Sequence, residues 1–330
     1  MASKEQIQKL IFNNNRRLQV LKEQQSLKGY NVAPETVLEI EDIEASIQSL
    51  QTQLTELIFE EVRADAPLVH LYTFGQPPAK VPEQAIVLDW RDKFEVTPPR
   101  TIPSPELWQS DLVPKILDLP NQVDGPGLIR LYGLGALSVA FTFGSAFREV
   151  GRYLLEVEQF FAGKSHFWYS DETPPGGQMA PEFVPHYLAG NPAATDGAVI
   201  VYAAPKQSLA EITASVGRYW GEADIFKAAL DGTGASEKLK GVLVLEAEMA
   251  SKKKQGLQSW EAAVLARQSG RPLADFINQT KPEKLHLFLA VPFGLAVFLG
   301  HQWNALNKKV QCYEWIGGDT IYAPAGELQF

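Results

Sequence analysis

An internal repeat is the feature of this sequence that most restricts its fold. Residues 129–147 (IRLYGLGALSVAFTFGSAF) and residues 285–303 (LHLFLAVPFGLAVFLGHQW) align without a gap. In both copies a strand-like apolar run is followed by a turn and an apolar helical run, and Gly144 aligns with Gly300. A repeat of this kind indicates a duplicated structural unit. We therefore expect two α/β units whose strand-to-helix turns face one shared site.

The offset between the two copies also matches shorter segments outside them. It aligns Glu158 with Glu314 within two strand-like runs that follow the copies, and it aligns two further runs that precede them. The matched runs are Leu154–Gln159 with Val310–Trp315, and Ile86–Leu88 with Val242–Val244. Strands that alternate with helices indicate open parallel sheets covered on both faces. The expected fold class is therefore α/β, with two fused halves at about residues 64–172 and 193–330.

Two stretches of the second half carry more specific expectations. Residues 173–192 are rich in proline and glycine, so they predict a linker or a surface flap. The run from Ser208 to about Ala229 predicts one continuous helix.

Composition narrows the class of protein. The 330 residues suffice for two domains, and 45% apolar with 21% charged residues is ordinary for a globular chain. A net charge of −9 argues against binding of long nucleic acids, which needs a basic surface. The single cysteine, Cys312, excludes an intrachain disulfide and fits a reducing cytoplasm. Because Cys312 lies in a predicted strand, we expect it in the core.

Neither an export signal nor a membrane segment is expected. Lys4, Glu5 and Lys9 interrupt the N-terminal stretch where an apolar signal core would lie. The longest apolar runs fall well short of the ~20 residues that a membrane helix needs. We therefore expect a cytoplasmic protein without a membrane partner.

Residues 1–63 predict a helical hairpin with narrow apolar stripes. Apolar residues recur at three- and four-residue steps on both sides of a break at residues 29–31, and Pro34 suits the first turn of the second helix. Two interpretations stay open: the hairpin packs on the next domain, or it is an interaction module that recruits a separate effector. The long stripe finds little partner surface in a lone hairpin, which favours the interaction module.

Residue patterns for catalysis or metal binding are missing. The sequence contains neither GxxxxGK[ST] nor HExxH, and its five histidines show no metal-ligand spacing. YGLGALSVA resembles a dinucleotide fingerprint, but Leu137 and Ser138 stand where the third glycine should fall. We therefore expect a binding protein with no catalytic residues, no metal and no standard cofactor.

The two strand-to-helix turns are the expected ligand site. Ligands of open α/β sheets bind beyond the carboxyl ends of the strands, where free N–H groups at helix starts favour phosphate. Lys206 would neutralise charge there, and aromatic residues could stack on bases, although core packing is an equal alternative for the tryptophans. The expected ligand-binding residues are Gly133, Leu134, Gly135, Leu137, Ser138, Trp168, Tyr169, Pro205, Lys206, Glu246, Pro292, Phe293, Gly294 and Trp315.

From about residue 68 to the end, the chain resembles the SAVED domain family. The resemblance rests on IVLDWRDKF, RLYGLGALSVAFTFGSAF, the pair YLLEVEQ and HFWYS, and LHLFLAVPFGLAVFLGHQWN followed by VQCYEW. It implies a sensor of CBASS or type III CRISPR immunity, built of two fused Rossmann-like (CARF-like) halves that form a pseudo-dimer. It further implies an adenine-containing cyclic tri- or tetranucleotide as ligand, bound between the halves, and assembly into a homo-oligomer or filament on binding.

The chain departs from the family pattern in its effector. SAVED proteins usually carry a nuclease, TIR or protease domain, whereas a helical hairpin precedes the resemblance here. The hypothesis is therefore a sensor-adaptor, in which stacked sensors cluster their hairpins and recruit an effector. Two alternatives remain: a ring nuclease-like enzyme that degrades its cyclic ligand, and a ligand-independent scaffold. The ring size, the linkage and the effector stay open.

Overall fold

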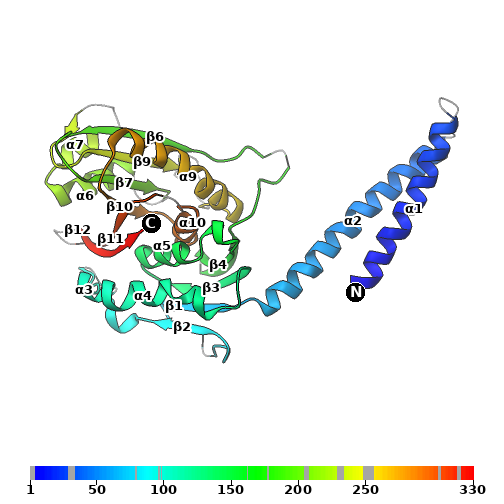
Figure 1. Ribbon diagram of the computed structural model, residues 1–330, viewed down its shortest axis with the longest axis horizontal. Coiled ribbons are helices and arrows are strands. Elements are labelled where there is room, and N and C mark those ends of the chain that lie inside the picture. The colour runs from blue at the N-terminus through cyan, green and yellow to red at the C-terminus, as the bar shows by residue number, and fades with distance from the viewer. Residues whose placement is uncertain are drawn as a thin grey trace. The chain divides into compact units, whose positions relative to one another are not determined.

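The computed structural model of the chain (Figure 1) forms two compact units, Met1–Ala66 and Pro67–Phe330. It describes residues 4–28, 34–78, 80–95, 97, 99–161, 163–176, 178–203, 208–228, 234–247, 256–303, 306–317 and 321–330.

The first unit is a helical hairpin, as predicted. Helix α1 (Lys4–Lys28) packs along α2 (Pro34–Asp65). Ile7 on α1 and Ile40 and Ile47 on α2 are buried. Further seam residues are half-buried at heptad spacing, namely Ile11, Leu18, Leu21, Ile43, Leu50 and Leu54. The exposed ion pair between Lys22 and Glu44 (2.6 Å) contributes little, so the seam holds the pair of helices together.

The second unit contains two sheets. Among the described residues, the first sheet has the strand order β2-β1-β3-β4-β5 and the second has the order β12-β11-β10-β7-β9-β6-β8. The strands of the first sheet are β1 (Leu68–Tyr72), β2 (Ile86–Asp89), β3 (Leu128–Leu134), β4 (Leu154–Phe161) and β5 (Lys164–Tyr169). Those of the second are β6 (Phe183–Gly190), β7 (Gly197–Tyr202), β8 (Ala235–Ser236), β9 (Gly241–Ala247), β10 (Lys284–Ala290), β11 (Lys309–Gly317) and β12 (Ile321–Gln329).

Strand order and direction confirm the predicted duplication. The series β2-β1-β3-β4-β5 of the first sheet corresponds to β9-β7-β10-β11-β12 of the second. In both series the first four strands are parallel and the last is antiparallel. The sheets are therefore mixed, whereas the sequence predicted parallel sheets throughout. Antiparallel neighbours need no crossover helix, so the last strand of each series can follow a short turn.

The gapless alignment is wrong by one residue outside the repeated block. Ile129 lies opposite Leu155 in the first sheet, and its counterpart Leu285 lies opposite Val310 in the second. Gln159, rather than Glu158, therefore corresponds to Glu314. The cause is a connection between helix and strand that is one residue shorter in the second copy, which a constant offset cannot represent.

The upstream match shifts in the same way. Val69 pairs with both Leu131 and Ile86, and in the second sheet Val199 pairs with Leu287 and Leu243. Because Leu131 corresponds to Leu287, the counterpart of Ile86 is Leu243 rather than Val242.

Two predictions for the second half need correction. The expected flap contains β6, which pairs antiparallel with β9 despite its internal Pro185. Proline is tolerated because, within the described ranges, β6 pairs with β8 only at Ala189 and Gly190, so the edge near Pro185 pairs with no described strand. The expected helix after Ser208 is two helices, α6 (Leu209–Trp220) and α7 (Ala223–Ala228), since Gly221 turns the chain at a φ of +73°.

Helices α5 (Leu137–Ala146) and α10 (Phe293–Gln302) pack against each other at the centre of this unit. A methyl group at Gly144 would lie 1.9 Å from the carbonyl oxygen of Val297, and one at Gly300 would lie 2.0 Å from that of Phe141. Val297 is the counterpart of Phe141 in the repeat, so the two contacts are equivalent. The halves thus meet through a self-complementary interface, which is the property of a two-fold axis.

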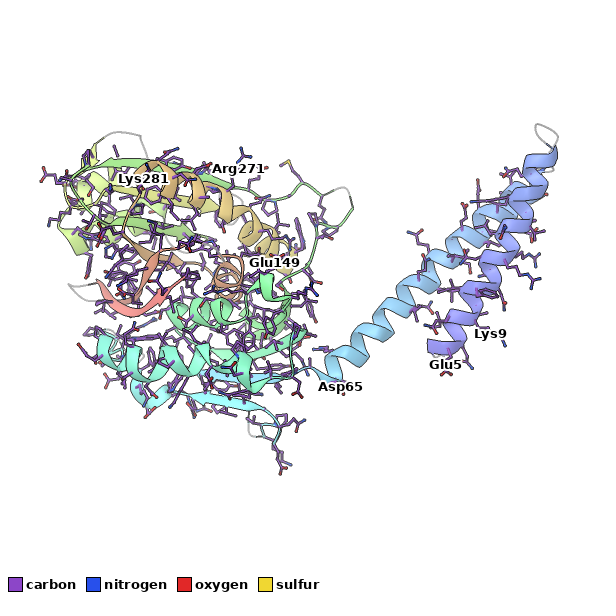
Figure 2. The ribbon with its side chains drawn as sticks, in the orientation of Figure 1. Glu5, Lys9, Asp65, Glu149, Arg271 and Lys281 are labelled. Atoms are coloured by element: carbon purple, nitrogen blue, oxygen red, sulfur yellow. The ribbon has the colours of Figure 1, made fainter. Side chains whose placement is uncertain are left out.

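One hydrophobic core joins both sheets through this helix pair. Leu71 and Leu131 of the first sheet, Val199 and Leu287 of the second, and Phe141 of α5 belong to the same buried cluster. Cys312 also lies in this core, where burial raises the pKa of its thiol. Figure 2 shows side chains filling the space between the sheets.

The remaining helices are α3 (Pro105–Leu107), the π-turn Trp108–Leu112, α4 (Val113–Leu117), α9 (Ser259–Thr280) and the short 3-10 turns Arg91–Lys93, Leu119–Gln122 and Glu149–Gly151.

The outer faces of the two sheets differ. On the second sheet, Ile212 and Val216 of α6 and Phe226 of α7 cover an aromatic cluster that includes Phe288 and Tyr313. On the first sheet, the corresponding face borders an open cavity under the loop that connects β1 to β2.

Candidate ligand-binding crevice between the two halves

The two strand-to-helix turns lie against each other. α5 follows β3, and α10 follows β10 at the equivalent place in the second half. A methyl group at Gly135 in the first turn would lie 3.5 Å from the ring of Phe293 in the second. These are the carboxyl ends of the central parallel strands, where open α/β sheets bind ligands. The structure therefore brings the two predicted turns together where the halves meet, and this junction of the two turns is called the crevice below.

Each helix start is capped by a side chain from the opposite half. The Ser138 N–H on α5 donates to Glu314 Oε1 at 2.6 Å, and the Gly294 N–H on α10 donates to Gln159 Oε1 at 2.9 Å. Ser138 corresponds to Gly294, and with the corrected register Gln159 corresponds to Glu314. The two caps are thus equivalent, but one uses a carboxylate and the other a neutral amide. These N–H groups, which the sequence predicted as phosphate donors, are engaged within the protein.

Glu314 is the most unusual ionisable group of the crevice. Glu314 is 6% exposed, and burial raises its pKa, while the hydrogen bond from the Ser138 N–H and the nearby Arg100 charge oppose that rise. A buried carboxylate without such donors would be strongly unfavourable. Beside it the Ser138 hydroxyl is buried, and no described residue forms a hydrogen bond with it.

Arg100 is a site residue that the sequence did not predict. Its guanidinium carbon lies 5.1 Å from the centre of the Trp315 ring and 5.6 Å from that of Phe74. Its Nε is buried and has no hydrogen-bond partner among the described residues, whereas its backbone N–H donates to Ile316 O at 2.7 Å. A cation held between two rings with a free donor can bind an anion or stack on a base. Arg100 lies in a proline-rich loop, and no periodicity in the sequence indicates the path of that loop.

Several predicted ligand-binding residues have structural contacts within the protein. Gly133 is part of β3, where a methyl group would lie 1.9 Å from the carbonyl oxygen of Leu71, so the glycine permits close strand packing. Leu134 follows it in β3 and lines the outer cavity. The Glu246 carboxylate lies 3.0 Å from His186 Nε2.

The aromatic candidates divide into buried and exposed residues. Trp168 is 5% exposed, and a methyl group at Gly294 would lie 2.5 Å from its ring, so it packs in the core. The Tyr169 N–H donates to Ser259 Oγ at 2.8 Å. Trp315 is 37% exposed and remains available for stacking.

The other predicted residues have simple placements. Pro292 is the N-cap residue of α10 and Leu137 is the first residue of α5, and both are half-buried. Pro205 and Lys206 lie outside the described residues. Across the described part of the chain, no group of three or more His, Cys, Asp or Glu side chains could hold a metal ion. No described helix is both long and apolar enough to cross a membrane.

The fold is an α/β unit of two similar halves, and comparison with known families gives this class a name. The family SAVED, described as the SMODS-associated and fused to various effectors sensor domain, matches residues 114–328. This is more than half of the chain, so the chain belongs to the SAVED family. The resemblance seen in the sequence is thereby confirmed.

Curated relatives match over short segments. The CD-NTase-associated protein 4 of Acinetobacter sp. (strain ATCC 27244 / 9458) is 37% identical over 62 residues, which are 19% of this chain and 13% of that protein. Its namesake from Moraxella osloensis is 39% identical over 56 residues, which are 17% of this chain and 11% of that protein. The chain therefore aligns with only a small part of these relatives.

Solved structures share the fold at low identity. The Acinetobacter baumannii Cap4 SAVED/CARF-domain containing receptor with the cyclic trinucleotide 3'3'3'-cAAA has a TM-score of 0.56 and 19% identity, covering 98% of this chain and 76% of that one. The same receptor with 2'3'3'-cAAA has a TM-score of 0.54 and 19% identity, covering 94% and 65%. At this identity the likeness establishes the two-half fold.

Proposed function

We propose that this protein senses a cyclic oligonucleotide of the cyclic oligoadenylate type in anti-phage defence of the CBASS kind. The observation that carries the proposal is the crevice in which two equivalent strand-to-helix turns meet across a pseudo-twofold axis. A ring-shaped ligand presents the same phosphate and base repeatedly, so one ring can contact both turns. Receptors that share this fold have been solved with cyclic trinucleotides.

Side chains, rather than helix ends, are the proposed contacts to the ligand. The Ser138 and Gly294 N–H groups are already bonded to Glu314 and Gln159, so phosphate recognition falls to cations. Arg100 offers a donor without a partner, and Trp315 offers an exposed ring beside it. Base stacking on such a ring contributes about 1–3 kcal/mol per base. Lys206 is proposed as a second cation from the sequence.

Calorimetric titration with 3'3'3'-cAAA and 2'3'3'-cAAA tests the proposal. We expect saturable binding of at least one ring, and much weaker binding of the matching linear trinucleotide, because the linear molecule must lose more conformational freedom. If neither ring binds, nor any cyclic tetranucleotide in the same panel, the sensor function is wrong.

The hairpin is proposed to pass the signal to a separate effector. Ligand binding would assemble the sensor units, and assembly would raise the effective concentration of the hairpins. Light scattering coupled to size-exclusion chromatography should show a larger species when the ring is added. An assembly state that does not change when the ring is added would instead support a ligand-independent scaffold. Linear products after incubation with the ring would support a ring nuclease-like enzyme.

A further inference from the structure

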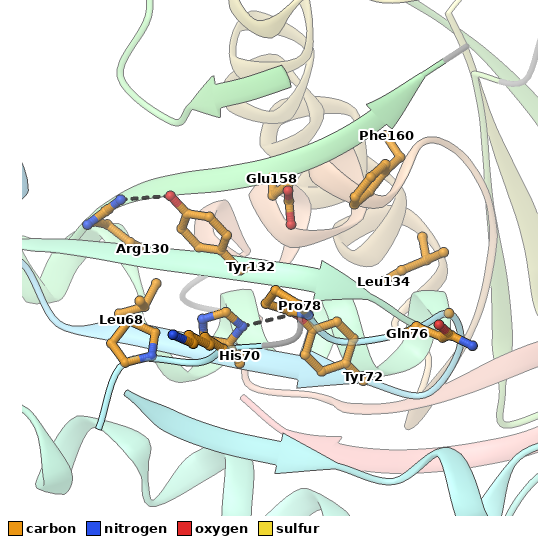
Figure 3. Close-up of a pocket in the computed structure, with 13 residues that line it drawn as sticks. Leu68, His70, Tyr72, Gln76, Pro78, Arg130, Tyr132, Leu134, Glu158 and Phe160 are labelled. Carbon is orange, nitrogen blue, oxygen red and sulfur yellow. Dashed lines mark hydrogen bonds between the residues drawn. The ribbon is translucent and has the colours of Figure 1, made fainter. Parts of the chain in front are cut away.

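A cavity of about 670 Å³ lies on the outer face of the first sheet (Figure 3). Its walls are side chains of β1, β3 and β4 together with the loop around Gln76 and Pro78. Small-molecule sites typically enclose about 300–1,000 Å³. In the second half the equivalent face is covered by α6 and α7. The cavity is therefore a feature in which the two halves differ, and it lies away from the α5–α10 side where the crevice is.

The floor of the cavity carries an unsatisfied polar atom. His70 is 2% exposed, and its Nδ1 lies 3.0 Å from the Tyr72 hydroxyl. Its Nε2 is buried and finds no hydrogen-bond partner in the part of the chain that the structure describes. Burial lowers the pKa of His70 and raises that of Tyr72 to about 12, so both are neutral at pH 7. A buried polar atom without a partner is unfavourable, and a ligand atom that bonds to it would remove this cost.

The charges in the wall are balanced. Arg130 Nε lies 3.2 Å from Glu156 Oε1, and its Nη2 donates to the Tyr132 hydroxyl at 2.7 Å. Glu158 accepts from Ser165 Oγ at 2.6 Å and from the Gly133 N–H at 3.2 Å. Each carboxylate oxygen can accept a further bond, so Glu158 can still bind an N–H donor. Of the charged residues that line the cavity, Arg130 is paired with the buried Glu156 behind the wall, which leaves the exposed Lys80 against Glu158. This balance favours a neutral ligand.

The upper wall is aromatic and open to solvent. Phe160 is 45% exposed, and deeper in the cavity the Tyr132 ring stacks on His70 with 5.4 Å between centroids. Figure 3 shows Phe160 and Glu158 extending from the same strand, with His70 and Tyr72 below them. A flat ring against Phe160 would therefore place its edge within reach of a carboxylate.

We propose that this cavity is a second binding site, for a neutral nitrogen heterocycle of nucleobase or nucleoside size. The ring stacks on Phe160, donates an N–H to Glu158 and forms a hydrogen bond with His70 Nε2. The site does not depend on the function proposed for the crevice.

Titration of the full chain with adenosine, guanosine, cytidine and uridine, followed by ligand-observed NMR, tests the site. We expect at least one nucleoside to bind saturably with a Kd below about 1 mM. Phe160→Ala should weaken that binding about tenfold or more. Phe161→Ala is the matched control, because Phe161 is 43% exposed on the same strand but points to the opposite face. It should bind like the parent.

Two further measurements distinguish nucleoside binding in the cavity from binding in the crevice. Arg100→Ala should leave nucleoside binding unchanged, and saturating 3'3'3'-cAAA should not displace the nucleoside. Binding by none of the four nucleosides would overturn the proposal, as would equal binding by the parent and Phe160→Ala. Displacement by the cyclic trinucleotide would also overturn it, since the nucleoside would then occupy the crevice. Thermal unfolding of each variant shows whether it is folded. If Phe160→Ala does not fold, Glu158→Gln is the second cavity variant to test.

Discussion

The two halves of the sensor unit are alike where they meet and unlike where they face outward. At their interface, the Gly144 contact with Val297 is repeated by Gly300 with Phe141. On the outer faces, aromatic packing under α6 and α7 in the second half is replaced in the first by a cavity lined with His70 and other polar groups. The duplicated strand-helix unit therefore provides the scaffold of the crevice. The remaining faces are then free to differ in stability and in binding.

The interface should be the part most sensitive to mutation, and equally so in both halves. Gly144→Ala and Gly300→Ala each place a methyl group about 2 Å from a carbonyl oxygen, so the helices must separate. We expect each variant to lower the free energy of unfolding by about 3 kcal/mol or more, at the upper end for overpacking. Urea denaturation measures this loss.

Gly270→Ala is the control for the interface variants. Gly270 lies within α9 with nothing within 4 Å of an added methyl group. Alanine there should stabilise the protein by about 0.5–1 kcal/mol, because glycine is a poor helix former. A large difference between the losses at Gly144 and Gly300 would contradict the two-fold description of the interface.

The outer faces should respond very differently to loss of an aromatic ring. Phe226→Ala removes a ring that is 1% exposed in the second half and should cost about 3–5 kcal/mol. Phe160→Ala removes a ring that is 45% exposed in the first half and should change stability by about 0.5 kcal/mol or less. Denaturation of both variants in one buffer compares them directly. Similar losses would mean that the first outer face is packed, not open.

Arg100 should matter for ligand binding. Arg100→Ala removes the cation beside Trp315, and we expect binding of 3'3'3'-cAAA to weaken about tenfold or more, since a hydrogen bond from a charged group contributes about 1.5–3 kcal/mol. Arg152→Ala, at an exposed position outside the crevice, is the matched control and should bind normally. Calorimetry on both variants gives the ratio of their dissociation constants for 3'3'3'-cAAA. Unchanged affinity in Arg100→Ala would remove this residue from the site.

The smallest effect should come from making the two helix caps alike. Glu314→Gln keeps an acceptor for the Ser138 N–H but removes the buried charge. Burial raises the pKa of Glu314, so the folded protein holds a proton more tightly than the unfolded chain does. The parent should therefore lose stability as the pH rises above the ordinary value of 4.5, and the variant should lose less. Denaturation between pH 4 and 8 measures the free energy of unfolding of both proteins. A larger loss of stability in Glu314→Gln than in the parent as the pH rises would contradict this prediction.

Much of the fold could be predicted from the sequence because apolar periodicity repeats within it. The strand-helix blocks around Gly144 and Gly300 were predicted correctly, and their glycines lie at the helix contact. The register beyond the blocks could not be predicted, since one residue in a connecting loop leaves no trace in a gapless alignment. That shift hid the equivalence of Gln159 and Glu314.

Less of the site could be predicted. Sequence reasoning located the two turns but assigned phosphate to N–H groups that Glu314 and Gln159 occupy, because a cap from a distant strand has no local signal. Gly133 is an expected ligand-binding residue by sequence, and no local pattern indicates that it also accommodates the neighbouring strand. Arg100 was missed because loops without periodicity give no position for their side chains.

Amide hydrogen exchange with and without 3'3'3'-cAAA tests the central claim most directly. If one ring occupies the crevice between the halves, exchange should slow in both turns together, at residues 134–140 and 291–298. Protection confined to one half, or to the strands that line the outer cavity, would contradict a shared site between the two copies.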